Sequence, residues 1–199
     1  MKRTTAPHTL IIGYGNTLRQ DDGVGYRMAE TIDRWDLPGV ISRSVHQLTP
    51  DLAAELASVQ RAIFIDAFPW DPTSDRSPAP PASSPLASPH PSSGTRGPHN
   101  TGHTSHTTEA EALYRLEPLD INQDINSSSA PRFPSTSLGS LGHSSNPRSL
   151  LLLAHTLYGA TCEGWWLLIP GQDFGFGEDF SPLTQAAQQQ AIDYLRSIL

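Results

Sequence analysis

Short apolar runs alternate with amphipathic segments along most of this chain. The apolar runs have the length and the turn-forming flanks of β-strands, and the segments between them repeat apolar positions at helical spacing. The pattern predicts strands at residues 9–12, 40–47, 62–68, 112–118 and 164–171, and helices at residues 25–35, 49–59, 148–159 and 181–199. Because helices separate the first three strands, we expect these strands to pair in parallel in a layered α/β fold.

Three of the predicted helices carry boundary signals. Thr49 and Ser181 are residue types that cap helix starts, and each is followed by a proline at the expected first helical position. The helix at 148–159 should close on Gly159.

A polar segment interrupts this pattern. Residues 71–108 consist mainly of proline, serine, glycine, histidine and threonine, and offer almost nothing to bury. Such a segment cannot recover the entropy it would lose on ordering. We therefore expect a disordered insertion within a single domain that spans residues 1–199.

Charge and cysteine content narrow the choice of partners and compartment. The 199 residues include 13 lysines and arginines and carry a formal net charge of -7, which argues against nucleic acid or an anionic membrane surface as a partner. Cys162 stands alone, so no internal disulfide is possible and a reducing compartment is expected. No apolar run has the roughly 18 residues of a membrane span. These features predict a cytoplasmic protein and leave its oligomeric state open.

Two carboxylates follow strands whose carboxyl ends should meet at one edge of the sheet. Asp22 comes after the first strand, in the stretch "GYGNTLRQDDGVG", and Asp66 ends the third strand. Ligands of open α/β sheets bind outside the carboxyl ends of the strands, so both side chains are candidates for one site. The plainer alternatives are that Asp22 caps a helix and Asp66 caps a turn. We expect the neighbouring Asp21 to be structural.

Histidine is the natural third ligand for a divalent metal at such a site. Of the eight histidines, four lie in the insertion and are better explained as a solvated polar tract: His90, His99, His103 and His106. His155 is expected to pack within its helix. His46, after a strand, and His143, in a loop before a helix, could both reach the site, and their spacing does not choose between them.

Other chemistries fit poorly. The turn "GYGNTL" lacks the third glycine of a dinucleotide-binding fingerprint, and its acidic residues would repel a pyrophosphate. No G-x-S-x-G nucleophile motif occurs. Cys162, beside an apolar strand, is expected to be a packed residue rather than a nucleophile.

The segments "GYGNTLRQDDGVGYRMAE", "IFIDA" and "GHSSNPRSLLLLAHTLYG" together resemble the hydrogenase maturation endopeptidases. The resemblance implies a three-layer α/β/α sandwich around a twisted, mostly parallel sheet. It also implies removal of a C-terminal extension from the large-subunit precursor of a nickel-iron hydrogenase, after nickel insertion. By position in the motifs, Asp22, Asp66 and His143 would be both the metal ligands and the catalytic residues. The expected metal is the substrate's nickel, with no organic cofactor.

Two other functions stay open at this point. A non-enzymatic nickel-binding chaperone would store metal on the histidine-rich insertion and would tolerate the loss of Asp66. A general metallopeptidase would degrade unrelated peptides with a metal of its own. Within the endopeptidase interpretation, the sequence does not separate recognition of nickel from catalysis by nickel, so hydrolysis could be aspartyl-type or metal-dependent.

Overall fold

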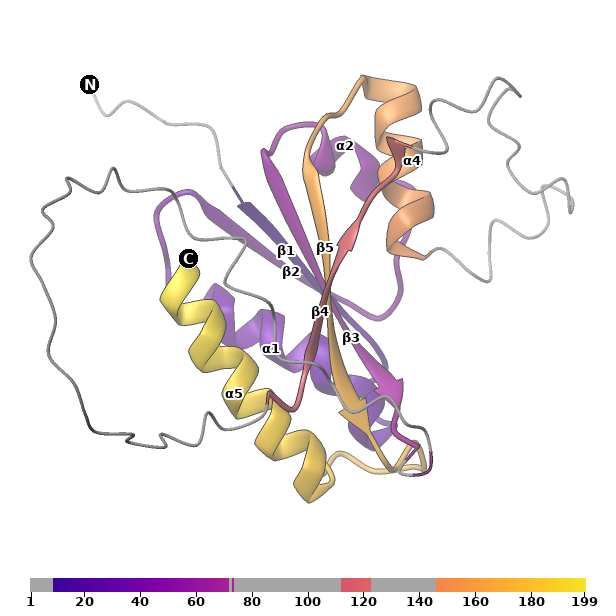
Figure 1. The fold of residues 1–199 in the computed structure, drawn as a ribbon, viewed down its shortest axis with the longest axis vertical. Coiled ribbons are helices and arrows are strands. Elements are labelled where there is room, and N and C mark those ends of the chain that lie inside the picture. The colour runs from indigo at the N-terminus through magenta and orange to yellow at the C-terminus, as the bar shows by residue number, and fades with distance from the viewer. Residues whose placement is uncertain (1–8, 72, 74–111, 123–145) are drawn as a thin grey trace, which may run out of the picture.

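The computed structural model describes residues 9–71, 73, 112–122 and 146–199. Within them, five strands form one sheet in the order β2-β1-β3-β5-β4 (Figure 1). Four strands are parallel, namely β1 (Thr9–Tyr14), β2 (Val40–Val45), β3 (Arg61–Pro69) and β5 (Glu163–Gly171). The fifth, β4 (Arg115–Leu119), pairs antiparallel with β5 at the edge. All five predicted strands are confirmed, as is the mostly parallel sheet.

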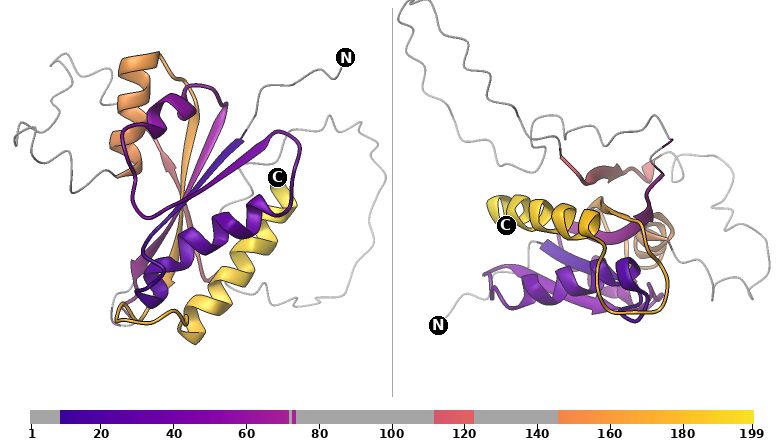
Figure 2. Two further views of the ribbon diagram at one scale, coloured as in Figure 1. Left: turned by 180° about the vertical axis from the view of Figure 1, so that it is seen from behind. Right: turned by 90° about the horizontal axis from the view of Figure 1, so that it is seen from below.

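Helices cover both faces of this sheet. On one face lie α1 (Val24–Asp33) and α5 (Pro182–Ile198), which run side by side in Figure 2. On the other lie α2 (Leu52–Leu56) and α4 (Pro147–Tyr158). Successive residues of β1 point to opposite cores, so Ile11 packs with α1 and α5 while Leu10 and Ile12 pack with α2 and α4. The three-layer arrangement is therefore confirmed.

The helix boundaries follow their capping residues. Ser181 and Asn146 have extended backbone and accept hydrogen bonds from the amides of Thr184 and Ser149, and a proline follows each. At the other end of α4, Gly159 adopts φ = 67°, a left-handed conformation that suits glycine. The predicted start of α5 and the predicted end of α4 are both confirmed.

The prediction for α2 was wrong in its extent. A helix was expected over residues 49–59, whereas α2 has five residues and its N-cap is Asp51 without a side-chain capping bond. The amides of Leu52 and Ala53 bond to the carbonyls of Thr49 and Pro50, three residues back, so the first turn is tighter than an α-helix. Thr49 therefore precedes the helix and does not cap it.

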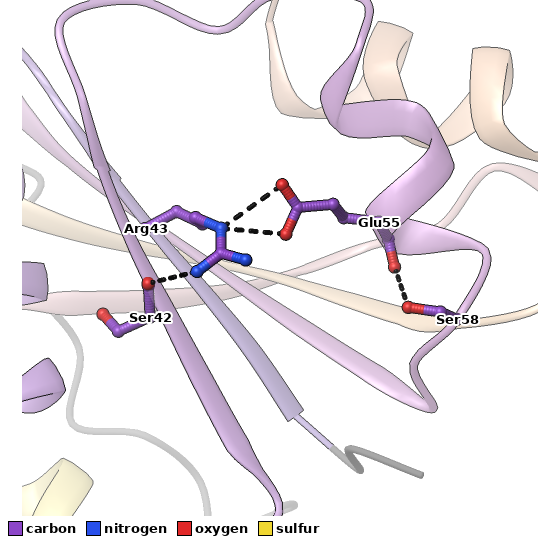
Figure 3. A network of polar contacts seen from close by, with 4 residues as sticks. All are labelled: Ser42, Arg43, Glu55 and Ser58. Atoms are coloured by element: carbon purple, nitrogen blue, oxygen red, sulfur yellow. Dashed lines mark hydrogen bonds and ion pairs between the residues drawn. The ribbon is translucent and has the colours of Figure 1, made fainter. Parts of the chain in front are cut away.

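Polar contacts fix the edge strand β2 to its neighbouring helices. The Arg43 guanidinium lies 2.9 Å from the Glu55 carboxylate of α2 (Figure 3), and the Ser42 hydroxyl donates to the Ala29 carbonyl of α1 at 2.7 Å. The Arg43–Glu55 pair is exposed to solvent and contributes about 0.2–1 kcal/mol. This network is structural and lies in the body of the fold.

α1 packs closely on the sheet, and this packing positions the segment between β1 and α1. A Cβ built on Gly13 would overlap the Gly25 carbonyl oxygen, and one built on Gly25 would overlap that of Ile65. The glycines therefore let the start of α1 lie directly on β1 and β3. A short 3-10 helix, η1 (Gln20–Gly23), which the sequence pattern did not predict, is thereby held at the carboxyl edge of the sheet.

The structure does not test two further predictions, the disordered insertion and the position of His143. Apart from Asp71 and Thr73, the insertion predicted at 71–108 lies outside them, and so does His143. Among the helices that are described, none has the length and apolar character to cross a bilayer.

Candidate functional site

The carboxyl ends of β1 and β3 lie side by side at one edge of the sheet. The parallel register pairs Gly13 with Ile65, which places Tyr14 and Asp66 at the same level on neighbouring strands. Asp22, in η1, follows β1 at this edge, and η1 packs against β3. The structure therefore brings together Asp22 and Asp66, which are 44 positions apart in the sequence.

Asp66 is largely withdrawn from water. Its Oδ1 accepts a hydrogen bond from the Ala67 amide at 2.8 Å. Burial, and to a lesser degree the negative charge of Asp22, raise the pKa of Asp66 to about 6, although hydrogen bonds from Tyr14 and Ala67 oppose this shift. The site thus holds a carboxyl group that exchanges its proton close to neutral pH.

Tyr14 is a member of this site that sequence reasoning missed. Burial and the neighbouring Asp66 carboxylate raise the pKa of the Tyr14 phenol far above its ordinary value, so the hydroxyl stays neutral and can donate to Asp66. The first strand was predicted to end at residue 12, two residues before Tyr14, and its register with β3 is visible only in the structure. No signal in the sequence therefore places this hydroxyl beside Asp66.

A tight turn holds Asp22. The Asp22 carboxylate accepts the Asn16 amide at 2.8 Å, and the Asn16 side chain accepts the Leu18 amide at 3.0 Å. Gly15 has φ = 135°, and a Cβ there would overlap the Asp22 carbonyl oxygen. The N-cap of α1 is Gly23 and it has no side-chain capping bond. The Asp22 carboxylate thus bonds to the turn at Asn16 and makes no capping hydrogen bond to α1.

Asp21 has a structural role, as predicted. Its carboxylate is fully buried and accepts three backbone amides, from Gln172 at 2.8 Å, Asp173 at 2.9 Å and Ser181 at 2.7 Å. Burial alone would raise the pKa of Asp21, but these hydrogen bonds lower it. Asp21 thus fixes residues 172–181 against η1.

The histidines divide by location. His143, together with the four histidines of the insertion, lies outside the described residues, so its placement beside Asp22 and Asp66 stays a prediction. His46 is exposed after β2 and stacks on Tyr26, with ring centroids 5.3 Å apart. His155 is half-buried in α4, where Nδ1 lies 3.0 Å from the Ala160 carbonyl, as expected for a packed histidine.

The donor set fits a divalent cation in part. Two carboxylates supply the oxygen ligands that such ions accept, and a cation between them would offset the burial and repulsion that act on Asp66. No group of three potential metal ligands forms among the described residues, so a third ligand would have to come from elsewhere.

Two cavities lie away from these carboxylates, near the amino-terminal ends of the parallel strands. One, of about 410 Å³, is lined by Thr9, Arg61 and Glu163, and the other, of about 440 Å³, by His155, Cys162 and Asp120. Burial raises the pKa of the Cys162 thiol to about 11, which fits its expected packing role and disfavours a nucleophilic thiolate.

Solved structures share this α/β sandwich over nearly the whole chain. They include a hydrogenase 2 maturation peptidase from a Thaumarchaeota archaeon, at 18% identity and a TM-score of 0.55, with 96% of each chain covered. They also include the NiFe hydrogenase maturation protease HycI from Thermococcus kodakarensis, at 15% identity and a TM-score of 0.55, with 97% of this chain and 92% of that chain covered. HybD from the same organism aligns at 17% identity and a TM-score of 0.52, with 96% and 97% covered.

At these identities the likeness shows the fold and leaves the activity to be tested. No protein-family model and no curated protein matches the sequence. The resemblance seen in the motifs is therefore confirmed as a structural one: the chain has the fold of the NiFe hydrogenase maturation proteases.

Proposed function

We propose that the protein is an endopeptidase that removes the C-terminal extension of a nickel-iron hydrogenase large-subunit precursor after nickel insertion. The observation that carries the proposal is the pairing of Asp22 and Asp66 at the carboxyl edge of a sheet with the maturation-protease fold. Two carboxylates beside each other suit a site that meets a cation brought by another molecule.

In this proposal the nickel belongs to the substrate. Asp22, Asp66 and His143 contact it while the hydrogenase subunit holds its other positions, and the contact orients the correctly loaded precursor. One of the two carboxylates then takes a proton from the attacking water. The Tyr14 hydroxyl holds Asp66 in place from the neighbouring strand. The partner is the large-subunit precursor, and the reaction would take place in the cytoplasm, where nickel-loaded precursor and a free thiol at Cys162 can coexist.

The test is cleavage of a purified, nickel-loaded precursor, followed on denaturing gels. Asp22→Asn and Asp66→Asn should each slow cleavage by about a hundredfold or more, because each removes a charged group at the reacting centre. His143→Ala should do the same if it completes the site. The matched control is Asp33→Asn, an exposed carboxylate in the last turn of α1, which should leave the rate unchanged.

The effects of these variants, together with the choice of substrate, separate the endopeptidase from the two alternative functions. A nickel-binding chaperone would lose its function when residues 71–108 are deleted and would tolerate Asp66→Asn, which is the reverse of the order that the endopeptidase predicts. A general metallopeptidase would cut unrelated peptides, such as denatured casein, as readily as the precursor.

A further inference from the structure

One large apolar side chain stands out by its exposure. Phe176, in the loop between β5 and α5, is 90% exposed, and Leu18, in the turn before η1, is 59% exposed. The two lie on adjoining segments, because the Gly177 amide donates to the Leu18 carbonyl at 3.1 Å and the Gln20 amide donates to the Gly177 carbonyl at 2.8 Å. We call Leu18, Phe176 and the acidic residues Asp173, Glu178 and Asp179 the edge-loop patch.

The exposure of Phe176 is fixed by a well-bonded backbone. The Arg19 guanidinium donates to the Phe174 carbonyl through Nε at 3.3 Å and Nη2 at 3.1 Å. The buried Asp21 carboxylate holds the amides of Gln172 and Asp173. The backbone of the loop is therefore held in place, and a partner would lose little free energy in ordering that backbone.

The patch is continuous with the candidate site. Leu18 belongs to the turn that holds Asp22, since its amide donates to the Asn16 side chain and the Asn16 amide donates to the Asp22 carboxylate. Two hydrogen bonds thus connect the apolar surface to the carboxylate. A polypeptide lying over Leu18 and Phe176 would therefore lie beside the turn that holds Asp22.

The charges around the patch favour a basic partner. Residues 16–27 and 172–180 together carry five carboxylates and two arginines. One of these arginines, Arg27, lies 3.5 Å from Glu178, and the other, Arg19, is 5.8 Å from the centre of the Phe176 ring. The exposed Asp173 and Asp179 leave the rim negative, so complementarity calls for lysine or arginine on the partner.

We propose that the edge-loop patch docks a segment of the precursor polypeptide in which apolar side chains lie next to lysine or arginine. The proposal rests on the proposed function and adds to it the substrate feature that the protein reads beside the nickel. Phe176 and Leu18 take the apolar side chains, and Asp173 and Asp179 face the basic ones. Docking there places the chain that leads to the bond to be cut over Asp22.

The experiment compares exposed apolar residues inside and outside the edge-loop patch. Phe176→Ala and Leu18→Ala are tested against Leu157→Ala, whose side chain is 61% exposed at the end of α4. Affinity for the nickel-loaded precursor is measured in the Asp66→Asn background, where the substrate is not consumed, and KM and kcat are measured in the wild-type background. We expect Phe176→Ala to raise Kd and KM by about tenfold with kcat retained, as for an interface hot spot.

Leu18→Ala should raise Kd by about threefold, Leu157→Ala should match its parent, and Asp179→Asn should reduce the dependence of Kd on salt. Precursor cleavage with Phe176→Ala equal to Leu157→Ala would overturn the docking surface and leave the proposed function intact. Binding through Phe176 without any cleavage by wild type would refute the endopeptidase and keep the docking surface. A change in the mass of the free protein on Phe176→Ala, measured by analytical ultracentrifugation, would assign the patch to self-association instead.

Discussion

Asp21 and Asp22 are neighbours in the sequence with opposite surroundings. Asp21 is fully buried and accepts three backbone amides, whereas Asp22 is partly exposed and accepts one, from Asn16. Successive residues of the turn point in different directions. The Asp21 carboxylate therefore stabilises the fold, while the Asp22 carboxylate lies at the candidate site. The two roles can be separated by mutation.

Asp21→Asn should destabilise the protein and Asp22→Asn should not. An amide in place of the Asp21 carboxylate would turn an N–H group toward buried donors, at a cost on the order of 2–4 kcal/mol in the free energy of unfolding. Urea denaturation at pH 7 measures it. Because the folded state lowers the pKa of Asp21 below 3.8, its stabilisation is present above that pH and is lost as the pH falls through the folded pKa. Equal destabilisation by Asp22→Asn would show that this division of roles is wrong.

Asp66 should cost the protein stability at neutral pH. Its pKa is about 6 in the fold against 3.8 ordinarily, so its contribution to stability is fully present below pH 3.8 and is lost as the pH rises through 6. Asp66→Asn, which has no charge to lose, should therefore be more stable than wild type by about 3 kcal/mol at pH 8, with no such gain near pH 4. Denaturation curves at both pH values measure the difference, and a gain that does not depend on pH would contradict the assigned pKa.

At the scale of elements, the unit formed by β1, η1 and α1 carries the site. Its glycines allow α1 to lie against β1 and β3, and the 3-10 helix is then held over the strand ends. The strands and helices of this unit could be predicted because their apolar periodicities differ. The 3-10 helix could not, because it has four residues and is formed by packing and by hydrogen bonds to residues far along the chain.

Gly25→Ala should be far more damaging than Gly159→Ala. The added methyl group at Gly25 would overlap the carbonyl oxygens of Ile65 and Tyr14, and we expect a loss of about 3 kcal/mol or more in the free energy of unfolding. At Gly159, φ is 67° but the space around a Cβ is open, so the expected loss is about 1 kcal/mol, from backbone strain alone. Denaturation in urea compares the two variants. Similar losses would show that α1 is not seated by glycine packing.

Elements with strong local signals could be predicted from the sequence, whereas features that depend on contacts between elements could not. The buried strands β3 and β5 and the capped helix α4 have strong local signals, so their predictions hold. The direction of β4 and the five-residue length of α2 depend on contacts with other elements, which no local pattern encodes.

At the scale of the whole molecule, the sheet order determines which residues meet. The order places β1 beside β3, which joins Asp22, Tyr14 and Asp66 at one edge, and the loop after β5 returns there to carry Phe176. Both carboxylates could be proposed from the sequence because they follow predicted strands. Tyr14 and the edge-loop patch could not, since they depend on strand register and on hydrogen bonds over more than 150 positions.

The measurement that tests the proposed function most directly is the intact mass of a hydrogenase large-subunit precursor before and after incubation with this protein. One sample of the precursor carries nickel and a second is prepared without it. We expect the loss of a single C-terminal peptide from the nickel-loaded precursor alone, and no loss with Asp66→Asn. An unchanged mass of every cognate nickel-loaded precursor would contradict the endopeptidase, and equal cleavage of both samples would contradict contact between its carboxylates and the substrate's nickel.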